Sequence, residues 1–310
     1  MNDIYDVVII GAGVTGYGTA MYAGRMGLKT LVVGETAGGT IILTDTVENY
    51  PGFKKLTGQE LADKLKEHAL DYKDFVEIKE GRVTKITREN ENSVFNVSIG
   101  DETVKAKTIV YATGSKHREL RVPGHDEYMN KGVHYCALCD GFFYRGKIVA
   151  IVGGSDSAVK EALVLAEHAE KVYIIYRKEN VRAEPVNLKR MNNQSKIEVI
   201  NNTNVTEIKG DIEKGVTGVV LDNDYNGSNE LQLDGLFIAI GHIPLSDVAK
   251  EAGVEINERG EIKINRKAET NIAGFFAAGD VVDTHFKQAI TGVAEGVLAA
   301  YGAYEYTKKM

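Results

Sequence analysis

The chain has 310 residues, of which 43% are hydrophobic and 26% are charged, and its net charge at neutral pH is -7. This length is sufficient for two domains of ordinary size, each with its own core. The acidic balance argues against a general nucleic-acid binder and does not favour binding to an anionic membrane surface. No uncharged apolar run approaches the roughly 18 residues that span a bilayer, and acids at Asp3 and Asp6 replace the basic start of a signal peptide. We therefore expect a cytoplasmic protein that binds neither nucleic acid nor membrane.

The first predicted element is a dinucleotide-binding unit at the start of the chain. A continuous apolar strand, residues 7–10, leads through a glycine turn, residues 11–16, into a helix that ends near Gly27. A second strand, residues 30–33, follows the helix. A G-x-G-x-x-G sequence is a weak signal alone, but here it lies between a strand and a helix, as dinucleotide binding requires.

Each glycine of this turn has a predicted function. Gly11 makes the tight bend, Gly13 lets a pyrophosphate approach the backbone, and Gly16 allows close packing of the helix against the strand. The helix N-terminus offers N–H groups and partial positive charge to the phosphates. Glu35, 24 residues after Gly11, lies where an acid accepts a hydrogen bond from a ribose hydroxyl.

The next segments lead to the middle of the chain. Residues 75–104 alternate polar and apolar side chains, which predicts an accessory antiparallel sheet. Residues 108–115 and 236–244 each have the pattern of a buried strand that ends in a glycine turn. These two segments bracket a second nucleotide-binding unit.

Cys136 and Cys139 are the only cysteines of the chain, and Asp140 follows them directly. The pair could be half of a zinc site, a structural disulfide, two inert core thiols or a redox couple. Zinc needs about four ligands, and the sequence offers no further cysteine and no spaced histidine pair. A disulfide that closes so short a loop restricts the unfolded chain little, and Asp140 and Gly141 are not typical of a core. We therefore predict a redox couple and no metal.

The second nucleotide-binding unit has the spacing of the first. A strand at residues 148–152 leads into the turn of residues 153–158, then into an amphipathic helix and a strand at residues 172–176. The residue 24 positions after Gly153 is Arg177. An arginine here suits a nucleotide with a 2′-phosphate, whereas an acid suits a free ribose diol.

Arg177, Lys178 and Arg182 form a small basic cluster in an otherwise acidic chain. A solvated charged turn would have the same composition, but the spacing from the glycines favours a phosphate-binding function. The two units therefore indicate two different dinucleotides.

The C-terminal segment belongs with the N-terminal unit. A strand at residues 274–277 precedes Gly279 and Asp280, and a helix rich in small residues begins near Gln288. Such a helix can approach a cofactor closely, and the acid can hold a ribityl or ribose hydroxyl. We expect an α/β fold with two Rossmann-like dinucleotide-binding domains of the three-layer ββα type. The second domain, residues 116–244, is inserted into the first, residues 1–115 and 245–310.

With these motifs in this order, the chain resembles the low-molecular-weight thioredoxin reductases, flavoproteins of the pyridine nucleotide-disulfide oxidoreductase class. The resemblance covers essentially the whole length. It rests on the first glycine turn, Gly38-Gly39, ENYPGF from Glu48 to Phe53, ATG from Ala112 to Gly114, the segment from Cys136 to Asp140, the second glycine turn, YRKENVRAE, AIGHIP, AAGDV and KQAITGVAEG.

The resemblance implies a site for each of two cofactors. The first domain would bind FAD through Gly11, Gly13, Gly16, Glu35, Gly39, Thr40, Asn49, Val83, Gly114, Asp280, Gln288 and Ala289. The inserted domain would bind NADPH, the electron donor, through Gly153, Gly154, Ser155, Ser157, Ala158, Arg177, Lys178, Arg182 and Gly241.

The resemblance also implies a reaction and the residues that catalyse it. Electrons would pass from NADPH through FAD to the Cys136–Cys139 pair, and then to the disulfide of thioredoxin or a thioredoxin-like protein. Cys139 would face the flavin, Cys136 would attack the substrate disulfide, and Asp140 would protonate the leaving thiolate. The family also implies a homodimer and a rotation of the inserted domain, with candidate hinges at residues 116–118 and 242–245.

Three departures from the family pattern concern the cofactor sites. Ser155 replaces a glycine of the second turn, which narrows the space for a pyrophosphate, and Thr40 stands where a glutamine is usual beside the flavin. Tyr176 and Lys178 replace a histidine and an arginine of the motif that binds the 2′-phosphate.

These departures leave other functions open. They include a disulfide reductase fed by ferredoxin or NADH, an oxygen-dependent dithiol oxidase, and a non-enzymatic FAD-bound redox sensor. His134, His242 and His285 lie beside the motifs, and we expect polar surface or packing functions for them.

Overall fold

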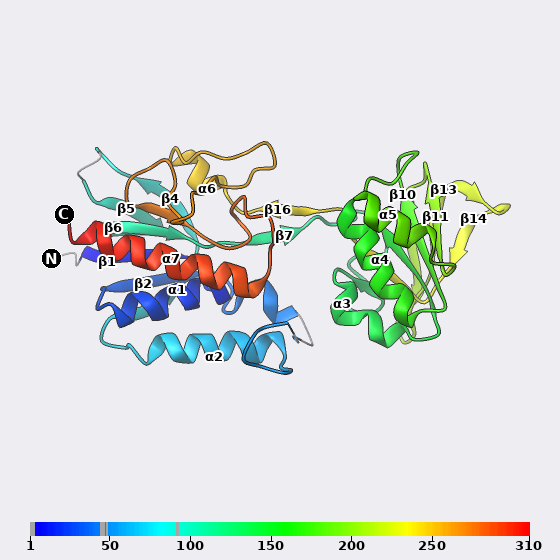
Figure 1. The fold of residues 1–310 in the computed structure, drawn as a ribbon, viewed down its shortest axis with the longest axis horizontal. Helices are drawn as coiled ribbons and strands as arrows, with labels where there is room; N and C mark the ends of the chain where they lie inside the picture. The colour runs from blue at the N-terminus through cyan, green and yellow to red at the C-terminus, as the bar shows by residue number, and fades with distance from the viewer. Residues whose placement is uncertain (1–3, 44–46, 48, 91–92) are drawn as a thin grey trace. The chain divides into compact units, whose positions relative to one another are not determined.

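The computed structural model describes residues 4–43, 47, 49–90 and 93–310 (Figure 1). Asp3 and Glu48, which belong to segments discussed above, lie outside the described residues. The chain packs as two compact units, Met1–Lys116 with Ile243–Met310 and His117–His242. The first unit is therefore discontinuous in sequence, and the second is inserted into it.

A seven-stranded sheet forms the centre of the first unit. The parallel part pairs β3 with β2, β2 with β1, β1 with β6 and β6 with β17, and the antiparallel part pairs β6 with β5 and β5 with β4. The strands are β1 (Ile4–Ile10), β2 (Thr30–Gly34), β3 (Val76–Glu80), β4 (Val83–Thr87), β5 (Phe95–Ile99), β6 (Glu102–Tyr111) and β17 (Phe275–Ala277).

Strand β1 is buried on both faces, which explains its continuous apolar sequence. Val7 and Ile9 belong to the core on one side of the sheet, and Val8 and Ile10 belong to the core on the other side. All four side chains are buried. Because successive side chains of a strand point to opposite faces, only an unbroken apolar run can supply both cores.

Helices lie on both faces of this sheet. The helices of the unit are α1 (Val14–Arg25), η1 (Gly39–Leu43), α2 (Gly58–Leu70), α6 (Asp247–Glu251) and α7 (Ala289–Thr307). Helix α1 packs against α2 and α7, as Figure 1 shows for α1 and α7. A Cβ atom at Gly296 would lie 2.3 Å from Thr19 Oγ1, so the small residues of α7 are what allow this approach.

The second unit contains a five-stranded parallel sheet in the order β11-β10-β9-β15-β8. A three-stranded antiparallel sheet, β12-β13-β14, accompanies it. The elements are β8 (Val133–His134), α3 (Ala137–Asp140), η2 (Gly141–Tyr144), β9 (Ile148–Val152), α4 (Asp156–His168), β10 (Lys171–Tyr176), α5 (Pro185–Asn192), β11 (Ile197–Asn201), β12 (Val205–Asp211), β13 (Gly215–Tyr225), β14 (Ser228–Gln232) and β15 (Gly235–Ile238).

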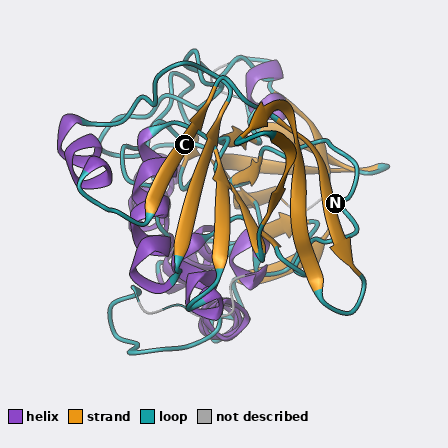
Figure 2. Ribbon diagram, turned by 90° about the vertical axis from the view of Figure 1, so that its right-hand side faces the viewer, coloured by secondary structure: helices purple, strands orange, loops and turns teal. Residues whose placement is uncertain are grey.

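These elements form three layers around two cores. Residues of α4 pack with Val149, Ile151 and Ile174 on one face of the parallel sheet. Residues of the three-stranded sheet pack with Ala150 and Ile175 on the other face. The helices and the strands of this unit can be followed in Figure 2. The layers are therefore antiparallel sheet, parallel sheet and helices.

Two short strands join the units. β7 (Ser115–His117) leads into the second unit, β16 (His242–Pro244) leads out of it, and the two pair with each other. The chain therefore enters and leaves the second unit through these two paired strands.

The predicted mixed α/β fold is confirmed, and both predicted strand–turn–helix–strand units are present. One expectation was wrong in part. β3, within the predicted accessory sheet, pairs in parallel with β2 and so belongs to the main sheet, whereas β4 and β5 are antiparallel as expected. Within the residues that the structure describes, no helix combines the length and the apolar character needed to cross a membrane.

Candidate active site

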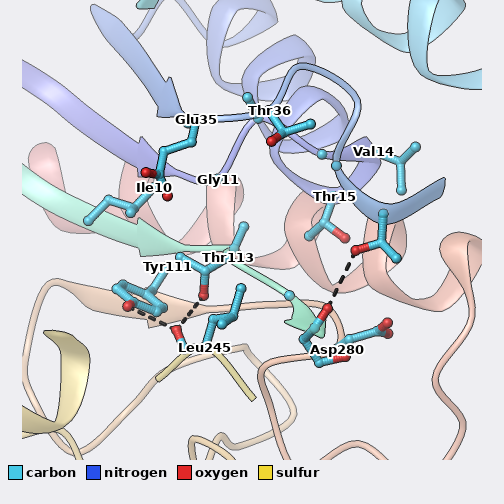
Figure 3. A pocket seen from close by; sticks show the side chains of 18 of the residues that line it. Ile10, Gly11, Val14, Thr15, Glu35, Thr36, Tyr111, Thr113, Leu245 and Asp280 are labelled. Carbon is cyan, nitrogen blue, oxygen red and sulfur yellow. Dashed lines mark hydrogen bonds between the residues drawn. The ribbon is translucent and has the colours of Figure 1, made fainter. Parts of the chain in front are cut away.

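A cavity of about 610 Å³ opens in the first unit beside the carboxyl ends of β1, β2 and β6. Ligands bind at the carboxyl ends of the strands in open α/β sheets. Ile10, Gly34 and Tyr111, which lie at the ends of these strands, all line the cavity. Figure 3 shows Ile10 and Tyr111. The sheet topology therefore forms the cavity where a dinucleotide is expected.

Most of the residues that were predicted to bind FAD line this cavity. Gly16 and Asn49 are the exceptions. Asn49 Nδ2 donates to Gln288 Oε1 at 3.0 Å, so it contacts a lining residue. The predicted residues in the lining are Gly11, Gly13, Glu35, Gly39, Thr40, Val83, Gly114, Asp280, Gln288 and Ala289.

The N-terminus of α1 fits the pyrophosphate of a dinucleotide. Its N-cap residue, Gly13, has no side chain to cap the helix, and the first turn contains no acid. A Cβ atom at Gly13 would lie 3.6 Å from the nearest protein atom, the Gly38 carbonyl oxygen, which is ordinary contact. The protein's own packing thus does not need a glycine here, and the space it leaves can admit phosphate oxygens close to the helix N–H groups.

Gly16 does not line the cavity but packs against the backbone of the glycine turn. A Cβ atom at this position would lie only 1.9 Å from the Gly11 carbonyl oxygen. No side chain can fit there without separating α1 from the turn. The contact agrees with the predicted function of Gly16 in close helix–strand packing.

Two hydroxyl groups of the lining bind the backbone of a third lining residue, Leu245. Tyr111 Oη and Thr113 Oγ1 both donate to the Leu245 carbonyl oxygen, at 3.0 and 2.8 Å (Figure 3). Burial raises the pKa of Tyr111 to about 12, so its hydroxyl stays protonated and available as a donor. Both bonds fix the chain where it re-enters the first unit.

Two cationic residues of the lining were missed by sequence reasoning. Arg82 lies 3.8 Å from Glu35, the predicted ribose acceptor, and both side chains are exposed. Lys287 Nζ lies 2.8 Å from Glu261 Oε1 and donates to the Asp280 and Val282 carbonyl oxygens. Lys287 could have been found, because it directly precedes Gln288, whereas no local pattern brings Arg82 to Glu35.

The two cysteines lie at the start of α3 in the second unit and form a disulfide with a Cα–Cα distance of 5.3 Å. Cys136 is the N-cap residue of this single-turn helix, and its sulfur accepts a hydrogen bond from the Cys139 N–H at 3.2 Å. Both cysteines are only partly buried. Among the residues that the structure describes, no group of three metal-binding side chains could hold an ion.

Asp140 belongs to a short polar chain beside the disulfide. His134 Nδ1 lies 3.4 Å from Asp140 Oδ2, and His134 Nε2 lies 2.7 Å from the Tyr144 hydroxyl. Burial, reinforced by the charges of Asp140 and Asp234, raises the pKa of Tyr144, so its hydroxyl donates. When this hydroxyl donates to Nε2, a ring proton of His134 lies on Nδ1, which faces Asp140. His134 therefore packs against Tyr144 and Phe237 and also contacts the predicted acid.

The second glycine turn differs from the first in its polar contacts. The Ser155 side chain caps α4 by accepting from the Ala158 N–H at 3.5 Å. Asp156, in the first turn, accepts from the Glu184 N–H and the Asn187 amide and pairs with Lys160. The Ser155 hydroxyl thus forms a hydrogen bond with the backbone of α4.

The predicted basic residues follow the carboxyl end of β10. The Arg177 and Lys178 side chains are exposed. Arg182 is held in place, because its backbone N–H donates to the Gly154 carbonyl at 2.7 Å and its Nε donates to the Tyr176 hydroxyl at 3.3 Å. The Tyr176 ring in turn packs on Gly154, where a Cβ atom would lie 2.3 Å from the ring.

The remaining residues predicted to bind NADPH occupy the same turn and a neighbouring loop. Gly153, Ser157 and Ala158 continue the glycine turn into α4, and Gly241 lies in the loop between β15 and β16. The Gly241 carbonyl accepts from the Arg118 N–H at 2.9 Å.

The sequence pattern of the pyridine nucleotide-disulphide oxidoreductases matches residues 5–296. The chain belongs to this family. A thioredoxin reductase of Mycolicibacterium smegmatis is 40% identical over 304 residues, which are 97% of this chain and 96% of the relative. The predicted resemblance to thioredoxin reductases is therefore confirmed.

Solved structures of this family agree with the fold. Thioredoxin reductase from Streptococcus pyogenes MGAS5005 is 36% identical, with a TM-score of 0.84 and 100% of both chains covered. A ferredoxin-flavin thioredoxin reductase from Clostridium acetobutylicum is 32% identical, with a TM-score of 0.52 and 99% of both chains covered. The name of the Clostridium acetobutylicum protein includes ferredoxin, whereas that of the Streptococcus pyogenes protein states no electron donor.

Proposed function

We propose that this protein is a thioredoxin reductase that transfers electrons from NADPH, through FAD and the Cys136–Cys139 pair, to the disulfide of a thioredoxin-like protein. The observation that carries the proposal is the Cys136–Cys139 disulfide with Asp140 beside it. A pair with only two residues between its cysteines, both of them partly buried, is suited to thiol–disulfide exchange and adds little to the stability of the fold.

The first unit is the proposed FAD-binding domain. The α1 N-terminus and Gly13 would hold the pyrophosphate, and Glu35 would accept a ribose hydroxyl. Asp280 and the start of α7 would contact the remaining part of the cofactor, since both line the same cavity. When bound, FAD supplies two-electron chemistry that links a nicotinamide to a disulfide.

The second unit is the proposed NADPH-binding domain. Its glycine turn and the basic residues lie together, because Arg182 is tied to Gly154 through its backbone. The exposed guanidinium of Arg177 can form charge-assisted hydrogen bonds with a 2′-phosphate.

The proposed exchange reaction uses both cysteines and one acid. The Cys136 thiolate attacks the partner's disulfide and forms a mixed disulfide, which releases one partner sulfur as a thiolate. Asp140 gives its proton to this leaving thiolate. Cys139 then gives its proton to the Asp140 carboxylate and attacks the Cys136 sulfur. This restores the Cys136–Cys139 disulfide and releases the second partner sulfur as a thiolate, which takes a proton from solvent.

We expect Asp140→Asn to reduce kcat for thioredoxin reduction by about two orders of magnitude, the usual contribution of a positioned acid. The amide keeps the shape of the side chain but has no acidic proton to give. The disulfide should still form, which alkylation and mass measurement would check. Turnover above half of the wild-type value at neutral pH would contradict the assignment.

We expect Arg177→Ala to raise KM for NADPH about tenfold and to leave KM for NADH nearly unchanged. One charge-assisted hydrogen bond is worth roughly 1.5–3 kcal/mol, and about 1.4 kcal/mol corresponds to a factor of ten in affinity. Arg190→Ala is the matched control, because it removes an exposed arginine from α5 instead. If both substitutions raised KM for NADPH equally, the cause would be the general loss of positive charge, and Arg177 would have no specific contact with the 2′-phosphate.

Steady-state assays with oxidised thioredoxin test the function as a whole. The purified protein should be yellow, with one FAD per chain, and NADPH should support faster turnover than NADH. The exposed Arg177 and Lys178 favour NADPH over the ferredoxin suggested by one relative's name. If reduced ferredoxin supports turnover and neither NADPH nor NADH does, ferredoxin is the electron donor. If no donor supports turnover, the protein is not a thioredoxin reductase.

We also propose a homodimer that works in the cytoplasm. Leu298 and Tyr301 of α7 and Tyr22 of α1 leave apolar surface exposed on two helices that pack together. A reducing compartment suits a dithiol that turns over. Light scattering during gel filtration would distinguish a dimer from a monomer.

A further inference from the structure

Helix α4, which packs against α3, carries a carboxyl with one buried oxygen, that of Glu161. The backbone N–H of Ala137, the residue that follows Cys136, donates a hydrogen bond to the carboxylate of Glu161. The second oxygen, Oε2, is buried and has no hydrogen-bond partner among the described residues. A buried and half-satisfied acid is costly for the fold, and nothing in the exchange reaction derived above uses it.

Packing explains why this carboxyl is fixed beside the disulfide. Glu161 lies one turn from Ala158 and from Leu165, both of which are buried in the core that α4 shares with Ala137. A Cβ atom at Gly141 would lie 3.2 Å from Leu165, so the chain after α3 runs in contact with α4. Glu161 therefore lies beside the apolar face of its helix and contacts the backbone of Ala137 at the start of α3.

The surroundings favour a proton on Glu161. Burial raises the pKa of its carboxyl to about 7, and the Ala137 N–H opposes this effect. The charged and titratable groups on α4 and on the elements packed against it have other contacts or are exposed. They are Asp140 and Tyr144 with His134, Asp156 with Lys160, Lys171 with Glu198, Tyr176 with Arg182, Tyr173 with Tyr225, His168 beside Phe142, and the exposed Glu167, Lys189 and Arg190.

We propose that Glu161 is a positioning residue that binds a proton when the Cys136–Cys139 disulfide is reduced. The inference rests on the proposed function only in taking the pair as a redox couple. Two electrons break the S–S bond and leave two sulfurs, of which one takes a proton and the other can remain a thiolate. A thiolate on the residue that precedes Ala137 places a second negative charge beside the Glu161 carboxylate, and like charges favour protonation.

The expected pH dependence follows from this coupling. Below pH 7, Glu161 is protonated with either form of the pair, so it does not affect the equilibrium. Above pH 7, the disulfide form carries an ionised Glu161, and reduction must draw a proton from solvent. The equilibrium constant for reduction should therefore fall more steeply with rising pH in the wild type than in a variant without this carboxyl. A coupling of one pKa unit gives a total difference of about tenfold.

Thiol counting in the full-length, flavin-loaded protein tests this proposal. The protein is equilibrated with mixtures of reduced and oxidised dithiothreitol at pH values from one unit below to one and a half units above neutrality. After an acid quench, alkylation and mass measurement give the reduced fraction of Cys136 and Cys139. Comparing wild type with Glu161→Gln cancels the titration of dithiothreitol itself, because both proteins meet the same buffer.

The proposal predicts that the ratio of the wild-type to the Glu161→Gln equilibrium constant falls about tenfold across this range. Glu167→Gln, which removes an exposed carboxylate from the same helix, should follow the wild type. If the glutamine variant does not fold, Glu161→Ala removes the carboxyl without leaving a buried amide and should give the same fall.

Parallel curves for wild type and either Glu161 variant would overturn the proposal. So would an equal fall for Glu167→Gln, since it would show a general effect of charge. A wild-type pair that dithiothreitol cannot reduce and re-form would instead refute the redox couple, and with it the proposed function.

Discussion

Replacing either cysteine by serine is expected to abolish NADPH-dependent reduction of thioredoxin while the protein keeps its flavin. A single thiol cannot form the intramolecular disulfide that completes the exchange. The cysteines lie in the second unit, whereas the residues that line the cavity all belong to the first unit. Cys136→Ser and Cys139→Ser should therefore elute yellow, with wild-type flavin content and no thioredoxin-dependent turnover.

The two cysteine variants should differ in what they trap. If Cys136 attacks the partner, Cys139→Ser leaves the mixed disulfide unresolved, and a covalent complex with thioredoxin accumulates. Cys136→Ser should form no such complex. Non-reducing gel electrophoresis and mass measurement would show the difference. Most of the wild-type turnover in either variant would refute the redox assignment, and the reverse trapping pattern would exchange the functions of the two thiols.

Alanine at Gly13 and at Gly16 should both remove FAD, but for different reasons. At Gly13 the added Cβ makes only ordinary contact with the protein, so we expect an intact fold and a loss of flavin affinity of at least tenfold. At Gly16 the Cβ would meet the Gly11 carbonyl at 1.9 Å, so we expect destabilisation as well. Overpacking of this kind costs roughly 1–3 kcal/mol of unfolding free energy.

Flavin absorbance per chain after gel filtration, together with urea unfolding of flavin-depleted protein, separates the two effects. Gly13→Ala should unfold at the same urea concentration as wild type, and Gly16→Ala at a lower one. Full flavin retention by Gly13→Ala would show that no phosphate approaches α1 at this point. Its destabilisation in the absence of flavin would show that the glycine serves the fold alone.

Features encoded within a short stretch of chain could be predicted from the sequence. The strand at residues 148–152 was predicted with the bounds of β9, and the helix expected near Gln288 begins at Ala289. Apolar runs, glycine turns and cofactor motifs are local signals, so they do not depend on knowledge of distant contacts. The same signals were sufficient to recognise the family.

Contacts between distant segments could not be predicted in this way. β3 joins the main sheet because it pairs with β2, which lies more than 40 residues earlier in the chain. The contact of His134 with Asp140 depends on how β8 and α3 meet, and that of Arg82 with Glu35 depends on the sheet order. Sequence spacing carries no information on such pairs.

The environment of Glu161 also could not be predicted from the sequence. Its sequence context, KEALVLAE, is that of an ordinary amphipathic helix with exposed acids. Only the packing of α4 against the chain that carries Cys136 distinguishes it from Glu167, which is exposed on the same helix. Burial of one acid among several is decided by tertiary structure.

The central claim is that electrons from NADPH reach the Cys136–Cys139 pair, and one anaerobic measurement tests it most directly. The oxidised, flavin-loaded protein is mixed with excess NADPH in the absence of thioredoxin, quenched in acid and alkylated, and the modified cysteines are identified by mass. We predict that both Cys136 and Cys139 are alkylated after NADPH and that neither is alkylated before it. A disulfide that stays intact under NADPH, but opens with dithiothreitol, would contradict the account.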